Sequence, residues 1–458
     1  MRPVNKSLLI AAALLVGCAH EPAAVPVLPA VPAAFSQTGA AANAQWAEAF
    51  HDPALLGLIT QARRQSPDLA VARARQGEAV ALLRAAAGND DAVFSLGLGQ
   101  EASRISVANG RFPPGIPRRT DVTVLGAKAS WELDLWGRAA ANTAAATADV
   151  RAAQFSAAQA DLALAAEVAR VWFAVRGARE QLTYLETEFT LRYQEMALIE
   201  QTKAAGLIDS DPLASARLAA AQAKVDEGLG RRRVAAAENA LRTLVGALPG
   251  SVLPVAQGTA TMPVFGAGVP SELLLRRPDL AAAAARLDSA VAREGAARAD
   301  FYPSLTITGQ GGWQADPTSR IGQGAAGFWS LAPALDLPIF DAGRREANLE
   351  VTRARIDGAG AEWTKVVLLA FREVEDALAD LRELAQQEEL TARVLAAVRE
   401  RLANAQARQQ AGLANANEIS LAQRDESLAA RTLSAVVWER RQVAVRLAAA
   451  TGGGWSAP

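Results

Sequence analysis

The sequence predicts a mixed fold of long α-helices and transmembrane β-strands, built from one structural unit that occurs twice. Three observations lead to this prediction. Landmarks in the first half return about two hundred residues later. Two stretches of nearly seventy residues contain no proline and are rich in helix-forming residues. Other segments alternate apolar and polar residues, as a strand with two different faces does.

The duplication is visible in matching glycines. Three of them recur at an offset of 206 positions, Gly137 as Gly343, Gly206 as Gly412, and Gly246 as Gly452. Upstream, the triplet that begins at Pro67 recurs at Pro278, an offset of 211. A period this long is not that of a solenoid repeat, so we expect a duplicated half-molecule.

The N-terminus resembles the export signal of a bacterial lipoprotein. Arg2 and Lys6 precede a short apolar run, which ends in Leu15-Val16-Gly17-Cys18. The run is too short for a membrane helix and predicts a signal peptide over residues 1–17. The resemblance implies diacylation of Cys18, and Ala19 after it favours the outer membrane by analogy. The alternative is a signal peptide with an incidental cysteine.

Composition argues against several classes of function. The 458 residues include two histidines and one cysteine, which leaves little for metal sites or for Cys/His and Ser/His/Asp catalysis. A net charge of −1 does not fit the basic surface of a nucleic-acid binder. We therefore expect no enzyme, no cofactor, no metal and no nucleic-acid partner.

The elements are expected in the same order in both copies. A lipid-anchored linker, rich in Ala, Pro and Val, covers 18–45, the first copy 46–247, a connector 248–270, the second copy 271–451 and a flexible tail 452–458. In the first copy we expect helices, strands at about 91–104 and 121–136, a long helix 138–205 and a return helix 212–245. In the second copy we expect a helix, strands at about 303–314 and 325–340, a long helix 344–411 and a return helix 418–451.

The helices and strands have recognisable patterns. Apolar residues of the long stretches recur every three or four positions, as in a coiled coil, and predict one antiparallel helical hairpin per copy. Each strand has an apolar and a polar face, which is typical of a transmembrane barrel. The alternative, a soluble sandwich, fits runs of this length less well. Since no later segment has about 20 apolar residues, any spanning structure should be strands. Four strands cannot close a barrel, so the chain should oligomerise.

The chain resembles the TolC-like outer-membrane factors, in their NodT/OprM-like lipoprotein branch that works with resistance-nodulation-division (RND) transporters. Six phrases carry the resemblance, in order: Trp46 to Leu55, Ser66 to Leu69, Val269 to Leu280, Ala299 to Leu305, Phe340 to Arg344 and Glu373 to Leu378. The resemblance implies a homotrimer with a 12-stranded outer-membrane barrel, contacting outer-membrane lipid, and a periplasmic α-barrel. It also implies a passive exit duct for small molecules that docks onto a periplasmic adaptor protein bound to an inner-membrane RND pump.

The resemblance places the functional element at the turns of the helical hairpins. It implies an acidic residue six positions after the second turn glycine, where this chain has Glu418, and sometimes another three further on, where it has Leu421. Asp209 and Asp211 follow the first turn and could join a periplasmic aperture. The alternative is that Asp209 and Glu418 only begin helices. Residues implied to contact the adaptor, and which also suit helix termination, are Ala205, Gly206, Leu207, Ala411, Gly412 and Leu413.

Two alternatives to the efflux duct stay open at this stage. One is a type I secretion duct that passes polypeptides; the lipoprotein signal and the phrase Arg276 to Asp279 favour efflux instead. The other is a structural coiled-coil envelope lipoprotein, which would leave the amphipathic strands unexplained. With three methionines and two histidines, the sequence offers no support for metal as the cargo.

Overall fold

The computed structural model describes residues 32–37, 39–43, 45–104, 106, 119–254 and 261–455. Within them the chain forms two compact units. One comprises 84–147 and 287–362, and the other comprises 32–83, 148–286 and 363–455. Each unit therefore contains matching pieces of both copies of the repeat. The signal peptide, Cys18 and most of the linker lie outside the described residues.

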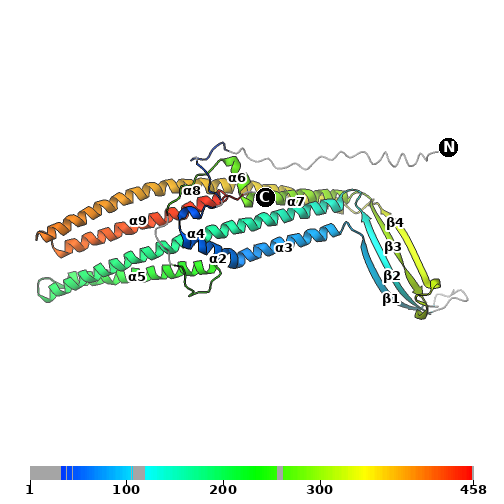
Figure 1. Cartoon of the computed structure of the whole chain (residues 1–458), viewed down its shortest axis with the longest axis horizontal. Helices are drawn as coiled ribbons and strands as arrows, with labels where there is room; N and C mark the ends of the chain where they lie inside the picture. Colours follow the sequence, from blue (N-terminus) through cyan, green and yellow to red (C-terminus); the bar gives the residue numbers. More distant parts are fainter. Residues whose placement is uncertain are drawn as a thin grey trace. The chain divides into compact units, whose positions relative to one another are not determined.

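The first unit contains one antiparallel sheet of four strands in the order β1-β2-β3-β4 (Figure 1). The strands are β1 Val93–Arg104, β2 Arg119–Leu133, β3 Ser304–Ala315 and β4 Gly327–Asp336. The central pair β2–β3 joins the two copies, with Trp131 opposite Ile307. Strands β1 and β4 are the two edges of the sheet, and among the described residues no further strand pairs with either edge.

The register separates the side chains of the sheet into an apolar and a polar face. Residues directly opposite each other in neighbouring strands lie on the same face. One face is apolar across all four strands, and its members on the two edge strands are strongly exposed, with Phe94 79% and Trp329 82% accessible. Its members are Phe94, Leu96, Leu98, Leu125, Ala127, Ala129, Trp131, Leu133, Leu305, Ile307, Trp313, Trp329, Leu331, Pro333 and Leu335. The other face carries mainly Ser, Thr, Gln, Lys, Glu and Gly.

Both strand-to-helix turns use a left-handed glycine. Gly137 has φ 76° before α4 (Arg138–Ala204), and Gly343 has φ 80° before α8 (Arg344–Gln410). Glycine adopts this conformation without the steric cost of a Cβ. An aspartate also accepts backbone N–H groups at each turn, Asp134 from Ala140 (2.8 Å) and Asp341 from Arg345 (3.1 Å). The left-handed glycine is thus repeated, while the bonding aspartate lies three positions before it in the first copy and two in the second.

The remaining elements are mostly helices. They are η1 Glu48–Phe50, α2 Pro53–Gln65, α3 Pro67–Gly88, α5 Ser210–Leu244, α6 Pro270–Arg276, α7 Pro278–Ala299, η2 Thr318–Arg320, η3 Gly324–Ala326 and α9 Ala416–Ala450. In the described part of the chain, none of the helices is long and apolar enough to cross a membrane. Strand β4 is shorter than the expected 325–340, because η3 precedes it and the chain leaves the sheet before Pro338.

The second unit arranges its long helices in the order α5-α4-α9-α8 (Figure 1). Arg179 pairs with Glu238 between α4 and α5 (2.7 Å), and Arg399 with Glu426 between α8 and α9 (3.0 Å). The two hairpins meet where α9 contacts α4. There Gly177 leaves room for Trp438, since a Cβ on this glycine would stand 3.1 Å from the Trp438 side chain. The single interior glycine of α4 therefore serves close helix packing.

The core of the second unit lies around Trp172, Phe173 and Phe50, which are fully buried. Asp52 is buried beside them and accepts four hydrogen bonds. They come from the N–H groups of Ala54 and Leu55, the Trp172 indole (2.8 Å) and Arg176 (2.9 Å). A buried carboxylate is tolerated only when it is bonded and paired in this way. Asp52 thus caps α2 and attaches it to α4.

The junctions between short helices receive the ends of the return helices. Gly246 follows α5 and lies where a Cβ would stand 2.7 Å from the Gln65 carbonyl oxygen, at the end of α2. Gly452 follows α9 and lies where a Cβ would stand 2.0 Å from the Arg276 carbonyl oxygen, at the end of α6. No other residue fits at either place. The same contact is therefore made once in each copy.

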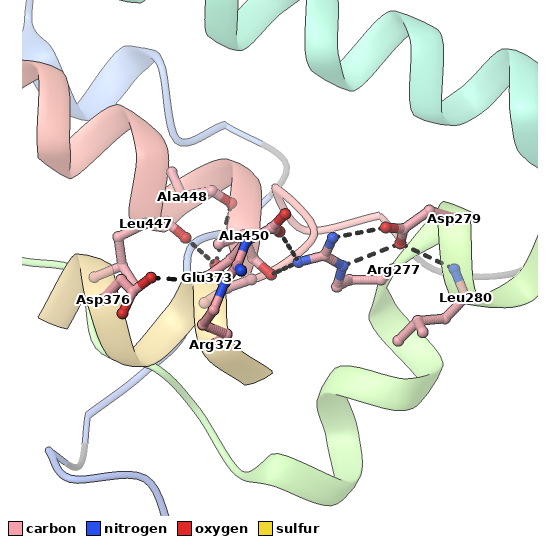
Figure 2. Close-up of polar contacts among 10 residues, drawn as sticks. Arg277, Asp279, Leu280, Arg372, Glu373, Asp376, Leu447, Ala448 and Ala450 are labelled. Carbon is pink, nitrogen blue, oxygen red and sulfur yellow. Dashed lines mark hydrogen bonds and ion pairs between the residues drawn. The ribbon is translucent and has the colours of Figure 1, made fainter. Parts of the chain in front are cut away.

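The second copy adds a buried arginine at this junction. Figure 2 shows Arg277 bonded to both carboxylate oxygens of Asp279 (Nη2–Oδ2 2.6 Å), to Glu373 (2.7 Å) and to the carbonyl oxygen of Ala450 (3.0 Å). Burial alone lowers the pKa of Arg277, but the hydrogen bonds and charges of the two carboxylates outweigh it and raise the pKa. Arg277 therefore stays charged and links α7, α8 and the end of α9.

We predict that Arg277→Ala destabilises the folded chain by about 3 kcal/mol, because it leaves the Asp279 carboxylate and the Ala450 carbonyl without their partner. Loss of helical circular dichroism on heating in detergent measures the effect. The matched control is Arg276→Ala, which removes an exposed i,i+4 pair with Glu272 worth about 0.5 kcal/mol or less. Equal melting temperatures of the two variants would contradict the structural role that we assign to Arg277.

Candidate functional site at the hairpin tips

The two hairpin tips are built by the same helix-ending motif. In the first, the Gly206 N–H donates to the Lys203 carbonyl (2.8 Å) and the Leu207 N–H to the Thr202 carbonyl (3.1 Å). In the second, Gly412 donates to Gln409 (2.9 Å) and Leu413 to Arg408 (2.8 Å). This pair of bonds is a Schellman motif, which requires a left-handed residue, and φ is 73° at Gly206 and 74° at Gly412.

The residues after these glycines are apolar and exposed. Leu207 is 73% and Leu413 is 69% accessible, although a Schellman motif often turns this residue against its own helix. Ala205 and Ala411 are also exposed. Each tip therefore presents a small glycine turn with one leucine toward the solvent. Both predicted roles, helix terminator and contact surface, are compatible with this geometry.

The predicted acidic residues lie at the starts of the return helices. Asp209 occupies the N-cap position of α5, but its side chain makes no capping hydrogen bond, and Asp211 lies exposed in the first turn. Glu418 lies in the first turn of α9, where the cap is Asn415, whose side chain accepts the Glu418 N–H (3.0 Å). Neither Asp209 nor Glu418 therefore provides the capping hydrogen bond of its helix. The positive end of the helix dipole still favours a carboxylate at both places.

Glu418 has a basic neighbour that the sequence did not suggest. Its Oε2 lies 3.6 Å from Arg408 Nη1, on the other arm of the same hairpin. Arg408 also donates to the Leu413 carbonyl (3.2 Å) and so spans the turn. Residues Glu400, Arg401 and Leu421 join these two around a cavity of about 370 Å³. Leu421 makes this part of the lining apolar.

The two hairpins are joined near their tips by an ion pair. Arg424 of α9 lies 2.9 Å from Glu195 of α4, and both side chains are largely buried, 11% and 17% accessible. Arg192 approaches the same carboxylate at 3.6 Å. The sequence alone did not indicate this pair, because two charges 229 positions apart carry no local signal. The only indication in the sequence was that both charged residues occupy positions on the apolar, packing side of their helices.

A larger groove opens between the hairpins beyond this ion pair. It has a volume of about 630 Å³ and a partly apolar lining that includes Leu198, Ile199, Ile208, Pro212 and Ile419. In the described residues, no group of three or more His, Cys, Asp or Glu side chains could hold a metal ion. The tips thus combine exposed leucines, a groove and separate carboxylates, which suits contact and passage.

The strands, helices and tips together define an outer-membrane duct, and comparison with known proteins supports this class. The chain belongs to the outer membrane efflux protein family, whose model matches residues 58–247 and 269–453. These two segments correspond to the two copies. The resemblance inferred from the sequence is therefore confirmed, as is the predicted fold class of helical hairpins with four strands.

Relatives and solved structures agree. Outer membrane protein OprJ of Pseudomonas aeruginosa is 35% identical over 71% of this chain and 68% of its own length. Toluene efflux pump outer membrane protein TtgF of Pseudomonas putida is 30% identical over 90% and 86%. The crystal structure of a membrane protein from Pseudomonas aeruginosa has a TM-score of 0.82 at 30% identity, covering 94% of this chain and 97% of that one. The chain is an efflux exit duct of the outer membrane, with long helices that extend into the periplasm.

Proposed function

We propose that three copies of this chain assemble into one passive exit duct, with no catalytic step. The observation that supports this proposal is the four-stranded sheet, whose two edges have no partner strand in the described part of the chain and whose apolar face is exposed. Unpaired backbone groups are not tolerated in lipid, so β1 of one copy should pair with β4 of the next. Three chains would supply twelve strands, enough to close a barrel.

The helical row supports the same assembly. Its outer helices, α5 and α8, both carry exposed apolar stripes. The exposed apolar residues of α5 include Leu218, Val225 and Leu229, and those of α8 include Leu390 and Val394. In α5, Val225 and Leu229 follow Leu218 by seven and eleven positions, which places all three on one face of the helix, as in a helix-packing seam. In the proposed trimer, α5 of one copy packs against α8 of the next and closes the periplasmic α-barrel.

We infer that the tips dock onto a periplasmic adaptor protein bound to an inner-membrane RND transporter. Gly206, Leu207, Gly412 and Leu413 form the contact surface, and the support for this is the exposure of both leucines beside the groove between the hairpins. Glycine turns allow a partner to approach the backbone closely. The transporter would supply the energy and select the small molecules, since the duct only conducts them.

We also infer that Glu418, Asp209 and Asp211 line the periplasmic aperture. Three-fold symmetry would repeat each carboxylate around one axis, and such rings attract cations. The free side chain of Asp209 and the exposure of Asp211 support this role. Arg408 beside Glu418 offsets part of its charge, so the aspartates should carry much of the effect.

We propose finally that Cys18 is diacylated and anchors the linker in outer-membrane lipid. The support is the short apolar run that ends in Leu15-Val16-Gly17-Cys18. A single acyl group binds membranes only weakly, whereas several chains anchor firmly. The anchor would add to the attachment that the strands provide.

Trimer assembly is tested by mass. Protein purified in detergent should have the mass of three chains after the detergent is subtracted, because a closed ring pairs every sheet edge and three chains give the twelve-stranded barrel that we propose. Circular dichroism on the same sample checks that the strands are present. A stable monomer with full strand content would contradict the proposal, since its edge strands would stay unpaired.

The aperture is tested by removing its acids. The triple variant Asp209→Asn, Asp211→Asn, Glu418→Gln should form trimers with altered conductance and a weaker preference for cations in planar bilayers. A matched control removes three acids away from the tips, with Glu272→Gln, Asp376→Asn and Glu383→Gln. If the tip variant conducts like the wild type, the aperture is closed by packing or lies elsewhere.

Lipidation is tested by labelling cells with a palmitate analogue. The wild type should take up the label and Cys18→Ser should not, since no other cysteine exists in the chain. With a cleavable export signal restored, the variant should still insert, because the strands span the membrane independently. Equal labelling of both proteins would remove the lipid anchor from the proposal.

A further inference from the structure

Lys128 lies near the middle of the polar face of the sheet. Its register places it directly opposite Ser95 of β1 on one side and Gln310 of β3 on the other, and Gln310 is opposite Ser330 of β4. The row across the sheet is therefore Ser95, Lys128, Gln310 and Ser330. Lys128 is the only charged residue in this row, and its side chain is exposed.

The rows on both sides of Lys128 consist mostly of small residues. The row toward the loops contains three glycines, Gly97, Gly126 and Gly312, followed by Phe328. The Phe328 ring lies over Gly126, where a Cβ would stand 3.4 Å from its edge. The row toward the helices contains Val93, Ser130, Thr308 and Ala332. Lys128 therefore has the longest side chain among these residues.

The acidic residues that the structure describes on this face are distant or already paired. Glu132 is four residues along β2, about 13 Å away at the rise of a strand, and it pairs with Arg138 at 2.6 Å. Glu101, opposite Val122, and Asp336, opposite Ser304, are each about 20 Å away along the strands. These separations exceed the screening length of about 8 Å in physiological salt. Measured along the strands, no acidic residue that the structure describes on this face therefore lies within that length of Lys128.

We propose that Lys128 forms a ring of positive charge inside the barrel, which favours small anions and the anionic groups of transported molecules. This inference rests on the proposed trimer, in which the apolar face contacts lipid and the polar face lines the lumen. Three-fold symmetry then repeats Lys128 three times at one level of the barrel. Rings of Lys or Arg select anions in other pores, and substitutions on the lumenal face change selectivity.

The ring is tested by reversal potentials of the full-length trimer in planar bilayers across a potassium chloride gradient. Lys128→Gln should lower the chloride-to-potassium permeability ratio about three-fold, and Lys128→Glu should lower it further, because both remove a central charge of the pore. Raising the salt concentration should reduce the difference between the variants, since salt screens the ring. Trimer mass checks assembly in each case.

Lys224→Gln is the matched control. It removes the same charge from α5, where Lys224 pairs with Glu227 at 2.8 Å, and it should leave the ratio unchanged. If wild-type pores form but both Lys128 variants keep the wild-type permeability ratio, the proposed charge ring is wrong, while the proposed duct is unaffected. An equal shift in Lys224→Gln would also overturn the ring, as a general charge effect. If the wild-type trimer does not conduct, both the proposed duct and the proposed charge ring are contradicted.

Discussion

Unpaired backbone groups at the edges of the β-sheet are the constraint on which the rest of this structure depends. In lipid, each N–H and C=O must find a partner within the protein, because no water is present to replace one. Within the residues that the structure describes, strands β1 and β4 leave two rows of such groups open, while the apolar face between them is exposed. A single chain therefore cannot be the stable membrane form. Additional copies must supply the missing partners.

The duplication reduces this problem but does not remove it. Pairing of β2 with β3 joins the two copies into one sheet, so that two hairpins share two edges instead of four. The same pairing explains why the compact units cut across the repeats. Each long helix starts beside a strand of its own copy and ends in a tip. Both copies must therefore contribute to both units.

Where the copies differ, their environments differ as well. Glycines at the ends of the return helices are the same in both, because each meets a carbonyl oxygen too closely for a side chain. The residue before the following Pro-Asp-Leu triplet is Ser66 in the first copy and Arg277 in the second. Only the second position has Glu373 and the Ala450 carbonyl as partners. Likewise α9 is capped by Asn415, whereas the N-cap side chain of α5, Asp209, makes no such bond.

The elements and the faces of the strands could be predicted from the amino-acid sequence. Left-handed glycines end helices through local geometry, and alternation with a period of two separates polar from apolar residues within any strand. Gly206, Gly412 and the residues around Leu125 and Leu331 were therefore readable without a structure. The family phrases further pointed to Glu418 and the hairpin tips, although local pattern could not tell cap from aperture.

How these elements meet could be seen only in the three-dimensional structure. The pairing of Arg424 with Glu195 and the packing of Trp438 on Gly177 depend on helices distant in the chain, and the place of Arg408 beside Glu418 depends on how the two arms of one hairpin pack. The same holds for the small residues that surround Lys128, because cross-strand neighbours follow from register and not from spacing. Such contacts arise from long-range packing, and a single sequence carries no periodic signal for them.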